Sequence, residues 1–179
     1  MAKNDRFTIW LLILQLTVVG SAGAFDGKRT GFCLGFGAGP GAITYFDDGE
    51  SDRKTRNGIQ TTLDIGAGIS DQLLILYSGH TMFCMTGDVN LVWGTPSVIV
   101  RFYFKPTSRS FYVFGGPAVA AGVAWGSYET GFGFGGHGVA VGGGYQFGQQ
   151  FQVELGTVLT SATNNTTRTI HATVNLIGY

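Results

Sequence analysis

The segment "GPAVAAGVA" (Gly116–Ala124) alternates small residues with residues that are mostly larger and apolar. One set is Gly116, Ala118, Ala120, Gly122 and Ala124, and the other is Pro117, Val119, Ala121 and Val123. A period of two is typical of a β-strand, because successive side chains point to opposite faces. A Gly/Ala face does not suit water, where Lys, Glu and Asp are expected. It does suit the interior of an eight-stranded barrel, which is only just wide enough for side chains. The segment therefore predicts a barrel strand whose apolar face looks outward, toward lipid.

The same period recurs along the chain in eight candidate strands, near 31–46, 57–70, 72–83, 89–104, 110–125, 137–147, 151–161 and 168–179. Short turns are expected at 71–72, 105–108 and 148–150, and longer polar loops at 47–56, 84–88, 126–136 and 162–167. An even number of alternating strands with this connection pattern predicts an all-β fold, an eight-stranded antiparallel up-and-down transmembrane β-barrel.

Composition narrows the functional classes. The 179 residues hold 11 Lys+Arg and 11 Asp+Glu, so the zero net charge offers nothing to attract nucleic acid. Charged residues make up 12% of the chain, against about 25% in a typical soluble domain. Because 44% of the residues are hydrophobic, a disordered chain is excluded.

The N-terminal residues have the form of an export signal. A basic start is followed by the apolar run Phe7–Gly20 and by the small residues Ala22–Ala24. The run is shorter than the roughly 20 residues that a spanning helix needs. We therefore expect residues 1–24 to be a signal peptide and residues 25–179 to be an outer-membrane barrel domain. The expected location is the outer membrane of a Gram-negative bacterium, after signal-peptide export.

Three segments carry a family resemblance: "GYQF" (Gly144–Phe147), "FQVELG" (Phe151–Gly156) and the aromatic C-terminus "VNLIGY" (Val174–Tyr179). With them, residues 31–179 resemble the small eight-stranded outer-membrane barrels of the OmpA transmembrane-domain and OmpX type. The resemblance implies a structural class and does not specify a function. Tyr179 departs from the family pattern, since it is out of phase with the outward residues Ile170, Ala172, Val174 and Leu176.

Four polar side chains fall on inward positions of the predicted strands: Asp64, Arg101, Glu154 and His171. An unpaired charge inside a narrow lumen is costly, so partners are expected. We predict a buried polar network that fills the lumen. A proton or ion path through the network is an open alternative.

The predicted outer loops supply an expected contact surface, made of Asp47, Asp48, Glu50, Asp52, Arg53, Phe132 and Phe134. The expected role is structural or surface interaction, with no wide pore, because side chains fill an eight-stranded lumen. The expected partners are outer-membrane lipid and lipopolysaccharide, with an extracellular ligand or host surface at the loops. Neither nucleic acid nor nucleotide is expected, and the barrel is expected to be a monomer.

Two other functions stay open: an envelope enzyme that modifies lipid A acyl chains, and a small-ligand binder or transporter. Some small outer-membrane barrels are lipid A acyltransferases or deacylases, and Ser78, His80 and His137 lie near predicted strand tops. The His-x-Ser-Asn stretch of the deacylases is missing. No catalytic residue or cofactor is assigned, and the spacing of the three histidines predicts no metal site.

The spacing G-x-G-x-x-G occurs at Gly131, Gly133 and Gly136, as in dinucleotide-binding loops. Such a loop needs a buried parallel strand before it and a helix after it. Here a polar segment precedes it and period-two alternation follows. We interpret 131–136 as part of an outer loop and not as a nucleotide site.

Cys33 and Cys84 are the only cysteines. The predicted strands place them near opposite ends of the barrel, at heights that differ by roughly 30 Å. A disulfide needs Cα atoms within about 7 Å. Two free thiols are therefore expected.

Overall fold

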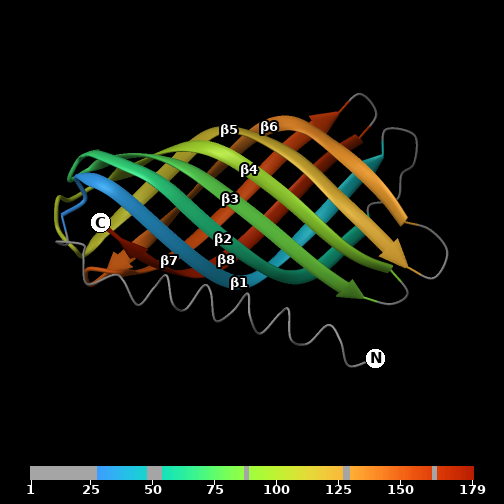
Figure 1. Cartoon of the computed structure of the whole chain (residues 1–179), viewed down its shortest axis with the longest axis horizontal. Helices are drawn as coiled ribbons and strands as arrows, with labels where there is room; N and C mark the ends of the chain where they lie inside the picture. The colour runs from blue at the N-terminus through green and yellow to red at the C-terminus, as the bar shows by residue number, and fades with distance from the viewer. Residues whose placement is uncertain (1–27, 48–53, 87–88, 127–129, 163–164) are drawn as a thin grey trace.

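The computed structural model describes residues 28–47, 54–86, 89–126, 130–162 and 165–179. They form one closed barrel of eight antiparallel strands in chain order, in which β1 also pairs with β8 (Figure 1). The strands are β1 (Gly31–Asp47), β2 (Lys54–Ser70), β3 (Leu73–Thr86), β4 (Val89–Tyr103), β5 (Ser110–Gly126), β6 (Thr130–Phe147), β7 (Phe151–Ala162) and β8 (Asn165–Gly178). The predicted fold class is confirmed. None of the described residues forms a helix that could cross a membrane.

The barrel has a turn end and a loop end, defined by the segments that connect the strands at each end. The turn end holds residues 71–72, 104–109 and 148–150 together with the C-terminus, at the left in Figure 1. The loop end holds the connections 48–53, 87–88, 127–129 and 163–164, which lie outside the described residues. The connections at the loop end were expected to be longer than those at the turn end. This prediction is wrong, because the strands continue further toward the loop end than their alternation indicates.

Strand β6 shows the largest such difference. It begins at Thr130, so the prediction that residues 131–136 belong to an outer loop is wrong. These residues pair with β5, for example Phe132 with Val123. The register shifts opposite Ala120/Ala121, next to Gly136 at φ +86°. A β-bulge with a glycine in the left-handed region keeps both halves of the strand paired, which periodicity does not reveal.

The outer wall of the barrel is apolar on every strand. Exposed hydrophobic side chains from β1 to β8 include Phe32, Ile65, Ile75, Val98, Val113, Val141, Leu155 and Val174. Between the two rims, the described part of this wall carries no Asp, Glu, Lys or Arg other than Arg168, near the loop end. A surface of this kind is unstable in water and matches the apolar band of a transmembrane barrel.

Glycines inside the barrel make room for large neighbours, as the small-residue alternation predicts. A Cβ atom at Gly142 would lie 2.5 Å from the carbonyl oxygen of Leu155 and would also collide with the ring of Phe114. A Cβ atom at Gly144 would lie 2.5 Å from the hydroxyl oxygen of Tyr112. Bare backbone on β6 therefore lets two aromatic rings from β5 lie across the lumen.

The interior has an apolar group of side chains in each half. Toward the turn end the group includes Cys33, Leu74, Leu76, Ile99, Tyr103 and Tyr112. Toward the loop end it consists of Ile43, Met82, Cys84, Leu91, Trp93 and Ala120. Cys33 and Cys84 thus lie in different groups and both are free thiols, as predicted.

Candidate functional site in the barrel lumen

Arg101 of β4 is the centre of a charged network that crosses the lumen. Its Nη2 donates to Oδ2 of Asp64 on β2 at 2.8 Å and to Oε2 of Glu154 on β7 at 2.9 Å. The side chain of Arg101 is fully buried. Neither β2 nor β7 is a neighbour of β4 in the sheet, so the bridge joins separate parts of the wall.

Further polar groups complete the coordination of the two carboxylates. The hydroxyl of Ser78 donates to Oδ1 of Asp64 at 2.6 Å, and the hydroxyl of Tyr112 donates to Oε2 of Glu154 at 3.0 Å. The guanidinium carbon of Arg101 lies 4.9 Å from the centre of the Tyr112 ring. These contacts offset the cost of burying three charges, because each charge has partners.

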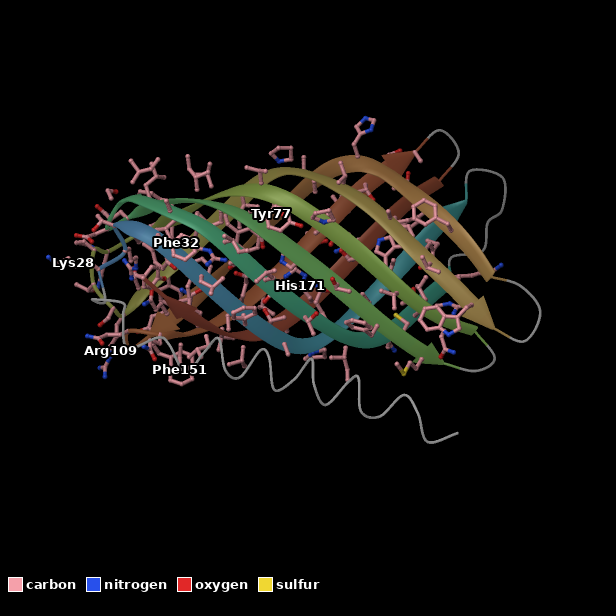
Figure 2. The ribbon with its side chains drawn as sticks, viewed as in Figure 1. Lys28, Phe32, Tyr77, Arg109, Phe151 and His171 are labelled. Carbon is pink, nitrogen blue, oxygen red and sulfur yellow. The ribbon has the colours of Figure 1, made fainter. Side chains whose placement is uncertain are left out.

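Two histidines face the other oxygen of Glu154. Nε2 of His171 lies 3.6 Å from Oε1, and Nε2 of His80 lies 3.9 Å from the same oxygen. Both rings are buried, and their centres lie 4.6 Å apart. Figure 2 shows His171 about midway along the barrel. His80 joins the four inward residues selected from sequence, all of which the structure brings into one cluster.

Arg29 seals the lumen at the turn end. Its guanidinium lies 3.7 Å from the centre of the Tyr103 ring. It donates to the carbonyl oxygens of Asp71 (2.7 Å), Lys105 (3.0 Å) and Thr107, and to Oε1 of Gln146 (3.0 Å). One side chain that precedes β1 thereby ties two of the turns to the end of β6. Arg29 could not be recognised from the sequence pattern, since it lies outside any alternating segment.

Tyr179 lies in the same seal and points inward, which explains why it is out of phase with the outward residues of β8. Its hydroxyl lies 2.8 Å from that of Tyr103 and accepts a hydrogen bond from Nε2 of Gln152 at 2.8 Å. It also donates to Gln146 at 3.2 Å. The C-terminal aromatic residue therefore belongs to the buried polar seal and not to the outer wall.

The residues weighed for acyl chemistry are not assembled into a catalytic group. Ser78 and His80 face the lumen, and the hydroxyl of Ser78 donates to Asp64 and not to a histidine. His137 is exposed on the other side of the wall. It lines an outer groove of about 420 Å³ together with Tyr77, Pro96, Val98, Pro117 and Val119.

The structure describes only some of the residues of the predicted contact surface. Asp48, Glu50, Asp52 and Arg53 lie outside the described residues, and Asp47 is the last residue of β1. Phe132 and Phe134 belong to β6 and not to a loop, which corrects their expected place. Phe132 is exposed, with 74% of its surface accessible. Paired backbone holds both residues where a flexible loop was expected.

Comparison with known proteins gives a likeness of fold. No family model and no curated protein matches the chain. The structure is similar to the attachment invasion locus protein Ail of Yersinia pestis (TM-score 0.53, 11% identity, 83% of this chain and 99% of that one). It is also similar to Neisserial surface protein A (TM-score 0.56, 13% identity, 82% and 97%). Ail has in addition been solved with the heparin analogue sucrose octasulfate (TM-score 0.52, 12% identity, 83% and 99%). The fold is that of the small eight-stranded outer-membrane barrels.

Proposed function

We propose that this protein is an outer-membrane barrel without an open pore, whose role is structural or interactive and whose loop end meets the cell exterior. The observation that carries the proposal is the combination of an apolar outer wall with a lumen crossed by Arg101. The wall suits lipid, and the bridge from β4 to β2 and β7 lies where an aqueous path would have to run.

The outer-membrane location rests on the wall and on the predicted signal peptide at residues 1–24, which lies outside the described residues. It is tested by membrane fractionation combined with gel mobility before and after heating. We expect the protein in the outer-membrane fraction, with a shift in mobility on heating. A soluble periplasmic protein would contradict the proposal.

Orientation is tested with cysteine substitutions at the two ends. Asp52→Cys probes the loop end and Arg109→Cys probes an exposed position at the turn end. The natural cysteines are buried and provide an unreactive background. A membrane-impermeant maleimide on intact cells should label Asp52→Cys and leave Arg109→Cys unlabelled. The reverse pattern would place the loop end in the periplasm.

The absence of a pore is tested in planar lipid bilayers. The purified barrel should give no steady conductance of porin size, because charged and aromatic side chains cross the lumen. Regular open-channel steps from the wild-type protein would contradict this part of the proposal and would favour the ion path.

Contact with extracellular ligands is proposed for the charged segment 47–53. The complex of Ail with a heparin analogue supports the idea, since it shows that a protein of this fold binds a ligand of this kind. Heparin is a polyanion, so replacing Arg53 with Gln should lower the retention of cells on immobilised heparin, whereas replacing Asp48, Glu50 and Asp52 with Asn should raise it. The matched control replaces Lys105 and Arg109 at the turn end, which should have no effect on intact cells.

Membrane lipid, including lipopolysaccharide, is the proposed partner of the outer wall. The groove beside His137 has apolar walls from β3 to β6, and an acyl chain of a surrounding lipid fits its chemistry. Acyl-transfer chemistry at this groove is not part of the proposal, because the inward Ser78 and His80 lie across the wall from His137.

A further inference from the structure

We propose that His80, Glu154 and His171 form a binding site for a divalent transition-metal ion, with Zn²⁺ as the reference ion, at the middle of the lumen. The three residues come from β3, β7 and β8. The site would clamp these strands together from the inside, independently of any function at the loop end.

The geometry supports a shared ligand. One ligand atom from each residue, all buried, lies within 4.8 Å of the other two. The two distances from histidine Nε2 to Oε1 of Glu154 are 3.6 and 3.9 Å. Two ligands bound to zinc at about 2.1 Å lie roughly 3.4 Å apart in a tetrahedral site. Small side-chain rotations would therefore bring the three atoms to bonding distance.

The ring nitrogens of the two lumen histidines make no hydrogen bonds to the described residues. Neither ring nitrogen of His80 or of His171 has a hydrogen-bond partner there, although both side chains are almost fully buried. A buried polar atom without a partner is costly, so the ring nitrogens are free to bind a water molecule or a metal ion. Glu154 meanwhile uses Oε2 for Arg101 and Tyr112, which leaves Oε1 directed at the two rings.

Charge balance favours a cation at the same place. Two carboxylates, Asp64 and Glu154, share the single guanidinium of Arg101. Among these three side chains one negative charge is left over, in a region with buried apolar side chains toward each end of the barrel. A cation beside Glu154 compensates that charge where solvent screening is weak.

The donor set selects the class of ion. Two imidazoles and one carboxylate suit zinc and other first-row transition metals, whereas Mg²⁺ and Ca²⁺ prefer oxygen ligands. The arrangement of Arg101 and Tyr112 on the far oxygen would orient the carboxylate, as outer partners do in known metal sites.

The test measures zinc retention and thermal stability. The full barrel is refolded in detergent with equimolar Zn²⁺, because the site is buried in the finished barrel, and unbound metal is removed by dialysis. Wild type should retain one Zn²⁺ per chain and unfold at a higher temperature than protein refolded with a chelator. Co²⁺ in place of Zn²⁺ should give the absorption bands of a low-coordinate site.

Substitution of each histidine shows whether the zinc ion binds in the lumen or at another histidine. His80→Gln and His171→Gln should each weaken zinc binding at least about 100-fold, since even an outer partner is worth about 10- to 100-fold. His137→Gln is the matched control, because this third histidine lies exposed on the outer wall. It should retain the metal.

Three results would overturn the site: no zinc retained by wild type, unchanged retention in both lumen variants, or loss of zinc in His137→Gln. The first would show that protons alone balance the charge of Glu154, and the last would show an adventitious surface site. If one lumen variant does not fold, the other variant and the Co²⁺ spectrum decide the question.

Discussion

Glu154 of β7 accepts a hydrogen bond from Arg101 of β4 at 2.9 Å, across the lumen of the barrel. The two residues lie far apart in the chain and on strands that do not pair. Their contact joins two strands of the wall that are not neighbours, so it is expected to contribute to stability.

Removal of the carboxylate should destabilise the barrel. Glu154→Ala leaves Arg101 with Asp64 as its remaining carboxylate, and the expected loss in the free energy of unfolding is about 2–3 kcal/mol. Urea unfolding in detergent, monitored by gel mobility, measures this loss in the free energy of unfolding. Glu154→Gln keeps an acceptor and should lose less. Equal stability of wild type and Glu154→Ala would contradict the bridge.

Removal of the guanidinium should cost more than removal of Glu154. Arg101→Ala leaves Asp64 and Glu154 buried without their shared cation, which is expected to cost about 3–5 kcal/mol. The double variant Arg101→Ala/Glu154→Ala should be less destabilised than the sum of the two single variants. Strict additivity in the same unfolding assay would show that the two side chains do not interact.

Arg29 should stabilise the turn end. Arg29→Ala removes its hydrogen bonds to two turns and to Gln146 and its stacking on Tyr103, with an expected loss of about 2–4 kcal/mol. Arg29→Lys should retain only part of that stability, since an ammonium cannot reproduce the planar fork. Arg109→Ala, an exposed turn substitution, serves as the control and should be neutral. Faster hydrogen exchange in the turns of Arg29→Ala would give independent support.

Gly142 should not tolerate a side chain. Gly142→Ala places a Cβ atom against the carbonyl oxygen of Leu155 and the ring of Phe114, and overpacking of this kind costs about 1–3 kcal/mol. Gly131→Ala on the same strand is the matched control, because nothing lies within 4 Å of its Cβ position. A Gly142→Ala barrel as stable as Gly131→Ala would mean that Phe114 does not lie over this glycine.

The two cysteines should behave as separate buried thiols. Both should resist alkylation in the folded barrel and both should react after unfolding, without any reductant. Mass spectrometry of the alkylated protein counts the modified residues. A requirement for reductant would show a disulfide, and with it a different arrangement of β1 and β3.

Much of the fold could be predicted because strand alternation is a local property. The inward phase of Asp64, Arg101, Glu154 and His171 follows from counting along each strand, and the structure places all four in the lumen. The start of β6 could not be predicted this way, although its end at Phe147 was. A bulge at Gly135, next to Gly136, shifts the register, and the alternation on the two sides of the bulge is out of step.

The class of structure follows from the sequence alone: eight alternating strands with an apolar face, a small or polar face and charged residues at inward positions. Which of the inward residues meet depends on how the strands pair around the barrel. His80, Glu154 and His171 are brought together by barrel closure and by the register of β3, β7 and β8, which depend on pairing between distant segments. For that reason the spacing of the histidines predicted no metal site, whereas the closed barrel brings three potential metal ligands together.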